Sequence, residues 1–318
     1  MLKSNVLFAT EKWCDARPDL GFTHNFHNYF HTFSQYGMTY STIHLDESYY
    51  VFNTHVDDVI VDYCFKYNIG VVFFSLLGDS PLNPSMDTLK KLKEMGVYLV
   101  FFWHDTGPGW AINTIGTLKE VADLHLAVDN SSYENDYLKE GKFLTLWTPE
   151  NKRLYYKQEQ DIDVSFVGSP RYLDRLNYLT QLQARCPYVH IRGGQREEKL
   201  SLEKYAELIR RSKIGLNFSS HSLGFYQTKG RVFEIIGSGS LLLESKNPQT
   251  AKLFTPGVDY VEFDGIDDLV MKIEYYKQND EERNKIANSG YQKYLKQYTS
   301  WHFWDLVVNR IKKDLNEK

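Results

Sequence analysis

Apolar runs and amphipathic segments alternate along the first half of the chain. Two runs, 71–77 and 97–103, are apolar throughout, which is typical of parallel strands that are buried on both faces. Between them, the apolar positions of 85–95 recur on one side, and Ser85 and Gly96 are the expected cap and stop of a helix. The same reasoning predicts further strands over 5–10, 39–45 and 122–128 and a helix near 24–36. This alternation predicts a parallel α/β domain.

The alternation starts again after a polar, proline-marked stretch, 148–160, which predicts a linker. The elements expected in the second half are strands over 163–168, 188–191, 214–218 and 240–244, helices over 170–185, 202–211, 230–237 and 267–278, and a terminal amphipathic helix over 301–313. We therefore expect two Rossmann-like domains of about 150 residues each, with ligands at the carboxyl ends of the strands in a cleft between the domains.

Composition and charge exclude several classes of protein. With 318 residues, of which 42% are hydrophobic and 25% charged, the chain can bury a substantial core. A net charge of −4 argues against a protein that coats a polyanion, and the 3 cysteines form neither a disulfide framework nor a zinc motif. The N-terminus lacks the apolar centre of a signal peptide, and no apolar run is long enough for a membrane helix. We expect a soluble, cytoplasmic protein.

The stretch 208–233 contains five cations and no acid, although the chain is acidic overall. Its end, T-K-G-R-V-F-E-I-I-G, predicts a helix that begins at about Lys229 or Gly230. Cations at a helix N-terminus oppose the helix dipole, whereas a bound anion makes that arrangement favourable. We therefore predict that Lys229 and Arg231 bind a phosphate group. The alternative is a solvated helix end.

Glu234 follows Arg231 by one helical turn, on roughly the same face. A carboxylate at this position can accept hydrogen bonds from a ribose diol, as acidic residues in nucleotide sites do. The alternative is an Arg231–Glu234 pair that only holds the turn.

Two other strand ends combine glycine with a cation. After the strand over 163–168, Gly168 permits a tight turn. Ser169 is the expected N-cap, Pro170 the first helical residue, and Arg171 lies where an anion would bind. The third strand end, H-I-R-G-G-Q, places a cation before two glycines that let the backbone approach a ligand: Arg192, Gly193 and Gly194. Three such ends in one half of the chain predict a nucleotide-diphosphate site.

In the first half, the strand over 97–103 runs directly into His104 and Asp105. A histidine at the carboxyl end of a strand is well placed to act as a catalytic or substrate-contacting group, and a structural imidazole is the alternative. Asp105 would either orient this imidazole or cap the next turn.

Three histidines fall within one arc of the first expected helix: His24, His27 and His31. The aromatic residues opposite this arc would face the core: Phe26, Tyr29, Phe30 and Phe33. No carboxylate shares the arc, so we favour a polar face that lines the cleft toward an acceptor over a metal site.

The segment K-G-R-V-F-E-I-I-G-S-G-S-L-L-L-E, with F-V-G-S-P-R before it and L-F-T-P-G-V-D-Y-V-E-F-D-G-I-D-D-L after it, resembles the CgeB-like (spore-maturation) branch of the group 1 glycosyltransferases. The resemblance covers 163–298 and is looser over 1–150. It implies the GT-B fold, with an acceptor-binding domain over 1–150, a nucleotide-sugar donor domain over 151–300 and a helix over 301–318 that crosses back to the N-terminal domain.

The resemblance also implies roles for single residues. Glu234 corresponds to a ribose-binding glutamate, the second acid of the family's E-x7-E motif, and residues 229–231 correspond to a loop that contacts the diphosphate. His104 corresponds to a histidine that many retaining members carry. Tyr226 stands where the first acid of the motif would hold the donor sugar, so sugar recognition departs from the family pattern and the stereochemical outcome stays open.

We therefore predict a retaining, metal-independent glycosyltransferase of the hexosyltransferase type. It needs no cofactor, its donor is a UDP- or GDP-sugar, and its acceptor is a glycan or a lipid-linked saccharide. Cations and helix N-termini would stabilise the departing diphosphate, while His104 bonds the sugar or the acceptor; with inversion, His104 or Asp105 becomes the base. Two alternatives stay open, namely a DNA-base glucosyltransferase and a non-catalytic nucleotide-sugar-binding module. The acidic net charge disfavours a nucleic-acid partner, and peripheral membrane contact stays open.

Overall fold

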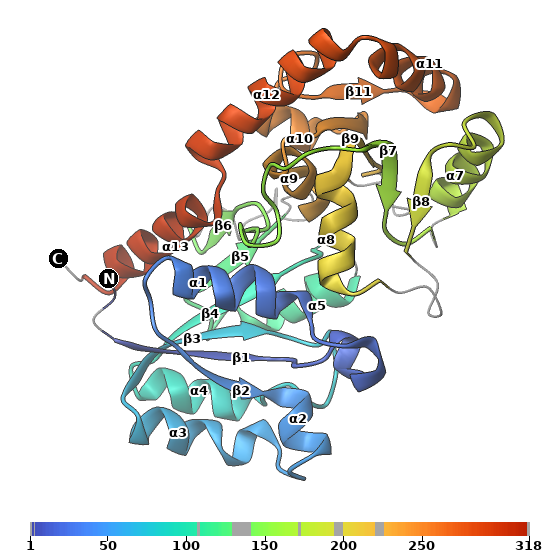
Figure 1. Ribbon diagram of the computed structural model, residues 1–318. Coiled ribbons are helices and arrows are strands. Elements are labelled where there is room, and N and C mark those ends of the chain that lie inside the picture. The colour runs from blue at the N-terminus through green and yellow to red at the C-terminus, as the bar shows by residue number, and fades with distance from the viewer. Residues whose placement is uncertain are drawn as a thin grey trace. The chain divides into compact units, whose positions relative to one another are not determined.

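The computed structural model consists of two compact units (Figure 1). Unit 1 comprises Met1–Trp147 and Ser300–Lys318, and unit 2 comprises Thr148–Thr299. The structure describes residues 2, 4–106, 109–128, 141–170, 173–193, 200–219 and 226–316. Each unit is built around one sheet in which the described strand pairs are parallel, which confirms the predicted α/β class.

Unit 1 has six strands in the order β2-β1-β3-β4-β5-β6. The strands are β1 (Asn5–Thr10), β2 (Ser41–His44), β3 (Ile69–Ser75), β4 (Tyr98–Trp103), β5 (Leu124–Ala127) and β6 (Phe143–Thr145). The helices are α1 (His31–Gln35), α2 (Leu45–Tyr50), α3 (Ile60–Lys66), α4 (Met86–Glu94), α5 (Gly109–Leu118) and α13 (Ser300–Asp314), with short turns η1 (Cys14–Ala16), η2 (Pro18–Leu20) and η4 (Val56–Asp58) and a π-helical segment η3 (Phe26–Phe30). The chain reverses its direction across the sheet between β1 and β3, and this switch point is where open α/β sheets bind ligands.

The two faces of this sheet are covered by different helices (Figure 1). On one face, residues such as Leu7, Phe74 and Phe101 pack against α3, α4 and α5. On the other face, Phe8 stacks on Phe73 with ring centroids 4.9 Å apart, beneath α1 and α13. Alternate residues of each strand thus supply two separate cores, as buried parallel strands require.

The terminal helix α13 packs on unit 1, as the predicted fold class requires, and it lies beside α1 in Figure 1. The Trp304 side chain is fully buried, and its Nε1 donates a hydrogen bond to Thr32 Oγ1 (2.8 Å). Its ring meets those of Phe33 and Phe73 at centroid distances of 4.6 and 5.8 Å. The helix therefore completes the aromatic core above the sheet.

Unit 2 has five strands in the order β11-β10-β9-β7-β8. The strands are β7 (Ile162–Val167), β8 (His190–Arg192), β9 (Ser212–Asn217), β10 (Leu241–Ser245) and β11 (Val261–Phe263). The helices are α7 (Leu173–Arg185), α8 (Leu202–Arg211), α9 (Gly230–Gly237), α10 (Pro248–Leu253), α11 (Gly265–Gln278) and α12 (Asp280–Gln297). Because β7 pairs with β8 on one side and β9 on the other, the switch point of this sheet lies between β7 and β9.

The stretch predicted as a linker, 148–160, is not a free connection. It has no helix or strand, but Glu150 and Tyr155 are buried in unit 2. The side chain of Thr148 lies against Gly230, where a Cβ would sit 3.5 Å from it. Two of its polar side chains bind to unit 2, since Arg210 Nε donates to Gln158 Oε1 (2.9 Å) and Gln160 Nε2 donates to Ser240 Oγ (3.0 Å).

Candidate functional site

The predicted strand ends of unit 2 meet at its switch point. Gly168, after β7, has φ of +151°, and a Cβ at this position would overlap the Arg231 guanidinium. Gly193, after β8, has φ of +83° and packs on Gly168, whose N–H donates to the Arg192 carbonyl (2.9 Å). The Arg192 side chain is exposed, and its Nη1 donates to the preceding carbonyl. Residues that the sequence analysis assigned to one site thus lie together.

Arg231 is held at the carboxyl end of β9. Its Nη1 donates to Asn217 Oδ1 (2.9 Å), and its guanidinium lies 5.0 Å from the centre of the Phe166 ring. It occupies the first turn of α9, which begins as predicted after Lys229 as N-cap residue. Lys229 Nζ in turn donates to Gln227 Oε1. Two cations and a helix N-terminus therefore lie at the carboxyl edge of the sheet, an arrangement that attracts anions.

A buried arginine that the sequence analysis missed ties the switch point together. Arg175 on α7 is only 8% exposed. Its Nη1 donates to the Ser169 carbonyl (2.8 Å) and its Nη2 to the Phe218 carbonyl (3.0 Å), so one guanidinium joins the backbones that follow β7 and β9. The sequence could have indicated this residue, because Arg175 shares its helix face with the buried Leu179 and Leu182. A charged residue on an apolar helix face is unusual.

A fully buried carboxyl group, Glu244 at the end of β10, lies beside the Arg231 site. Its Oε1 accepts hydrogen bonds from Asn217 Nδ2 (2.9 Å), Asn247 Nδ2 (3.3 Å) and Ser219 Oγ. Burial raises the pKa of Glu244 to about 7, and these hydrogen bonds act in the opposite direction. The sequence analysis missed this residue, whose only signal is an acid at the end of an apolar strand.

Glu234 is nearly enclosed by protein, with 8% of its surface exposed. It accepts a hydrogen bond from the Tyr205 hydroxyl on α8 (2.7 Å). Burial, and after it the charge of Glu234, raises the pKa of both Tyr155 and Glu150. The Arg231 guanidinium also interacts with the Tyr205 hydroxyl, so Glu234 and Arg231 share this neighbour, and ribose binding by Glu234 stays a prediction.

Three of the five cations in 208–233 lie away from this site. Arg211 pairs with Asp161 (2.6 Å), Lys213 pairs with Asp163 (2.7 Å), and Arg210 donates to a carbonyl upstream of β7. They lie where β9 begins, and a six-residue strand puts about 20 Å between its two ends. Only the last two cations of the stretch reach the carboxyl edge.

The helix start predicted after β7 is wrong. Pro170 lies outside helical structure, and α7 is described from Leu173 onward. Ser169 is therefore not the N-cap, and its carbonyl is instead held by Arg175. The candidates Arg171 and Gly194 lie outside the described residues.

In unit 1, His104 follows β4 at the carboxyl edge of the sheet. Its side chain is exposed, and its ring centroid lies 5.6 Å from that of Tyr29. Crowding by protein atoms lowers the pKa of His104; the charge of Asp105 opposes this effect and His24 adds to it. Three predicted residues therefore lie close together, and a neutral imidazole can both donate and accept a hydrogen bond.

The histidine arc is altered by the π-helical segment η3, whose wider turns change which side chains share a face. Phe26, predicted to face the core, is half-buried, and its ring centroid lies 5.4 Å from that of His31. The His27 and His31 rings are 5.3 Å apart. The prediction is wrong for Phe26 and confirmed for three buried aromatic residues: Tyr29, Phe30 and Phe33.

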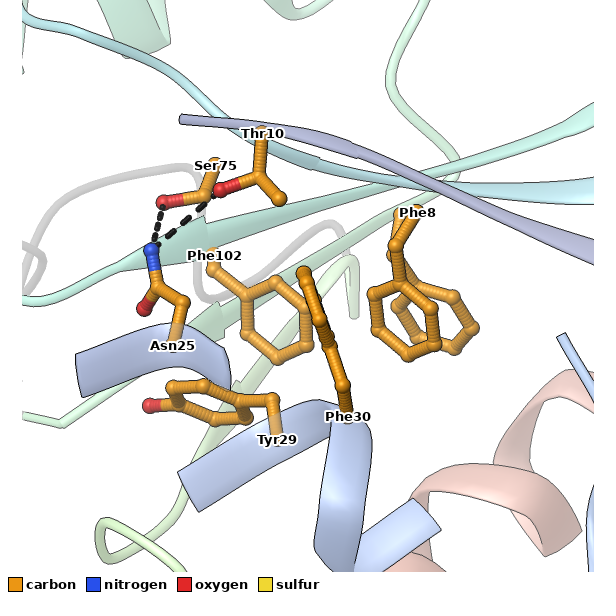
Figure 2. Close-up of a pocket in the computed structure, with 8 residues that line it drawn as sticks. Phe8, Thr10, Asn25, Tyr29, Phe30, Ser75 and Phe102 are labelled. Atoms are coloured by element: carbon orange, nitrogen blue, oxygen red, sulfur yellow. Dashed lines mark hydrogen bonds between the residues drawn. The ribbon is translucent and has the colours of Figure 1, made fainter. Parts of the chain in front are cut away.

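Asn25 closes the switch point of unit 1 (Figure 2). Its Nδ2 donates to Thr10 Oγ1 at the end of β1 (3.3 Å) and to Ser75 Oγ at the end of β3 (3.2 Å). All three side chains are buried, and the rings of Tyr29 and Phe30 line the small cavity beside them. Neutral polar groups and aromatic rings thus fill the position that cations occupy in unit 2.

Within the described residues, no three His, Cys, Asp or Glu side chains are grouped in a way that could hold a metal ion. In the same part of the chain, no helix has the length and apolar character needed to cross a membrane.

Comparisons with known proteins point in one direction. Residues 152–309 match the glycosyl transferase-like family model. HepE of Anabaena, solved with UDP-glucose, superposes with a TM-score of 0.61 at 11% identity, over 98% of this chain and 100% of that chain. Sucrose-phosphate synthase of Thermosynechococcus elongatus gives a TM-score of 0.63 at 12% identity, over 98% of this chain and 99% of that chain.

A glycosyltransferase of Rickettsia africae is similar over 100% of both chains, with a TM-score of 0.62 and 11% identity. Among curated protein sequences, none is similar enough to count as a match. The family match and the shared two-sheet architecture lead to one conclusion: residues 152–309 are a glycosyl transferase-like domain, and the chain has the GT-B fold.

Proposed function

We propose that unit 2 binds a nucleotide-diphosphate sugar and that the enzyme transfers the sugar to a hydroxyl group of a glycan or a lipid-linked saccharide. The observation that carries this proposal is the position of Arg231 across the switch point, against Gly168 and Asn217 and at the N-terminus of α9. A guanidinium and a helix N-terminus both favour a bound diphosphate. The sequence motifs within residues 163–298 support a place for the enzyme in the CgeB-like branch of the glycosyltransferases.

UDP is the favoured nucleotide of the donor. HepE, which shares the fold, was solved in complexes with UDP, with UDP and glucose, and with UDP-glucose. At 11% identity the likeness does not extend to single residues. GDP therefore remains the comparison ligand in the test below.

The chemistry we propose is electrostatic. As the glycosidic bond breaks, negative charge grows on the leaving diphosphate, and Arg231, Lys229 and the first turn of α9 stabilise it. These positive groups can supply the charge that a divalent cation supplies in other transferases, so we propose a metal-independent reaction without a cofactor. In a retaining reaction, an oxygen of the leaving diphosphate takes the proton of the acceptor hydroxyl.

Unit 1 is the proposed acceptor-binding part of the enzyme. Desolvation lowers the pKa of His104, so its imidazole is neutral near pH 7 and can donate to, or accept from, a sugar hydroxyl. His24 lies near it, and His27 follows one turn later along the same helix. If the reaction inverts the anomeric centre, His104 or Asp105 takes the role of base.

Isothermal titration with UDP and with GDP tests the donor site. We expect UDP to bind and Arg231→Ala to weaken this binding strongly. The matched control is Arg211→Ala, since Arg211 is bound to Asp161 away from the site. Failure of both nucleotides to bind the wild-type protein would contradict the proposal.

A panel of UDP- and GDP-sugars, followed by NMR of the product, tests the reaction itself. We expect slow hydrolysis of one donor in the absence of an acceptor, with the same rate in EDTA as in Mg²⁺. An unchanged anomeric configuration supports retention. A rate that falls in EDTA would contradict the metal-independent mechanism, and an inverted product would move the role of base to His104 or Asp105.

A further inference from the structure

A buried hydrogen-bond network connects Glu244 with Arg231. Asn217 is the link, because its Nδ2 donates to Glu244 Oε1 (2.9 Å) and to Ser219 Oγ (3.1 Å), while its Oδ1 accepts from Arg231 Nη1 (2.9 Å). Ser219 Oγ also donates to Glu244. Glu244, Asn217 and Ser219 are fully buried, so water does not compete for these hydrogen bonds.

The orientation of the Asn217 amide depends on the chemistry of its neighbour. Above its raised pKa, Glu244 is ionised and only accepts hydrogen bonds, so the amide must turn its NH₂ toward Glu244. Its oxygen then faces Arg231, which only donates. If the side chain at position 244 can also donate, the Asn217 amide is free to rotate. Its NH₂ group would then face the Arg231 guanidinium, and two donors repel each other.

The same carboxyl group also reaches the second cation of the site. Asn247 Nδ2 donates to Glu244 Oε1 (3.3 Å) and to the backbone carbonyl of Gln227 (3.1 Å). The side chain of Gln227 accepts from Lys229 Nζ. One buried group thus supports the residues that hold both Arg231 and Lys229.

We propose that Glu244 is a positioning residue of the donor site: by fixing the Asn217 amide it holds Arg231 in the orientation that binds the diphosphate. This inference rests on the proposed function, because it assumes that Arg231 contacts the donor. In this proposal Glu244 acts through Asn217 and Arg231 and does not itself contact the sugar or the reacting atoms.

Glu244→Gln is the first test, because glutamine keeps the shape of the side chain but offers a donor as well as an acceptor. Titration with UDP at about pH 8.5, where Glu244 is ionised, should show Kd raised about tenfold, the effect of one misplaced charge-assisted hydrogen bond. The matched control is Glu262→Gln. Glu262 is the register partner of Glu244 on β11, and its carboxylate accepts from Tyr260 instead. The control should leave Kd unchanged within about twofold.

A double-mutant cycle separates positioning from general damage to the fold. In an Arg231→Ala background, Glu244→Gln should change the Kd for UDP by less than about twofold, because the residue through which it acts is absent. Uridine lacks the diphosphate, so its affinity should be the same in wild type and Glu244→Gln. Loss of uridine binding, or an undiminished effect in the double variant, would show that Glu244 acts on the fold rather than through Arg231.

The outcomes separate this inference from the proposed function. If wild type binds neither UDP nor GDP, the donor site itself is wrong. If wild type binds UDP and Glu244→Gln binds it equally well, only the positioning role is overturned. Asn217→Ala gives an independent check, since it should raise Kd as much as Glu244→Gln does, and the two changes together should not add.

Discussion

The switch points of the two sheets share their topology and differ in their chemistry. In unit 1, Asn25 joins the ends of β1 and β3 through two neutral hydrogen bonds, with aromatic rings beside it. In unit 2, Arg175 joins the backbones after β7 and β9, and Arg231 lies against Gly168 in front of them. Parallel strands bring their carboxyl ends together in both units, but the described groups that join the two strand ends are neutral in unit 1 and cationic in unit 2.

The comparison teaches that strand order locates a possible site, whereas side chains decide its use. A neutral, aromatic-covered switch point contributes to packing, and a cationic one contributes to anion binding. The two units should therefore respond differently to substitution. Changes in the aromatic layer of unit 1 should cost stability, and changes at the switch point of unit 2 should cost ligand affinity.

The largest effect is expected for Trp304→Ala in the aromatic core of unit 1. This fully buried ring fills space against Phe33 and Phe73, so its removal should lower the free energy of unfolding by about 3–5 kcal/mol. Urea denaturation measures this change. Trp301→Ala on the same helix is the control, because Trp301 is 54% exposed, and it should cost less than about 1 kcal/mol. Equal losses would mean that α13 does not complete this core.

The next-largest effect is a pH dependence of the free energy of unfolding that comes from Glu244 in unit 2. Burial raises the pKa of Glu244 from 4.5 to about 7, so the folded state holds a proton that the unfolded state releases between these values. The resulting stability is present below about pH 4.5 and is lost as the pH rises to 7, a change of about 3 kcal/mol.

Unfolding of wild type and Glu244→Gln across pH 4.5–8 isolates this contribution, because glutamine does not titrate and other groups cancel in the difference. Asn25→Ala offers a contrast, since the side chains of Asn25, Thr10 and Ser75 do not titrate in this range. A difference between wild type and Glu244→Gln that stays flat with pH would contradict the buried carboxyl.

Arg231→Ala should raise the Kd for UDP about 50-fold, since it removes a charge-assisted contact worth about 2–3 kcal/mol. Stability should fall as well, by about 1–2 kcal/mol in the free energy of unfolding, because the fully buried Asn217 Oδ1 loses its donor. Titration of the variant and of Arg211→Ala in parallel gives the answer. Equal UDP affinity in Arg231→Ala and Arg211→Ala would mean that the diphosphate does not bind at Arg231. The switch point of unit 2 would then have no special role in anion binding.

The smallest effect is expected for Asn25→Ala. It leaves the hydroxyls of Thr10 and Ser75 without their shared donor and should cost about 1–2 kcal/mol in the free energy of unfolding. The Kd for UDP should stay within about twofold of wild type, as measured by the same titration. A large loss of UDP affinity would show that unit 1 also takes part in donor binding.

Much of the fold could be predicted from the apolar pattern, but the helices α2, α3, α5, α10 and α12 and the short strands β6 and β11 were not predicted. The buried strands were found because both of their faces are apolar, and α8 and α9 were predicted with the observed bounds. The helix α12 was missed because its buried side is apolar only in part. Arg283 and Gly290 lie there beside apolar residues, and a Cβ on Gly290 would overlap the Asp259 carbonyl. Close backbone packing gives no periodic apolar signal.

The site could be predicted only in part, for a related reason. Glycines and cations at strand ends are local signals, and they pointed to Gly168, Gly193 and Arg231. Asn217 and Glu244 matter because β9 and β10 lie side by side, which depends on strand pairing rather than on neighbouring positions in the sequence. Single-sequence patterns do not report which strands pair.

The return of α13 to unit 1 has a consequence for synthesis of the protein. Unit 2 is one continuous segment, whereas unit 1 needs a helix that leaves the ribosome only after all of unit 2. Because domains fold as their chains emerge, the later-encoded half can reach its final structure first. Until then the phenylalanine layer that Trp304 covers stays open to water, and in this interval the nascent enzyme is most exposed to aggregation and to chaperones.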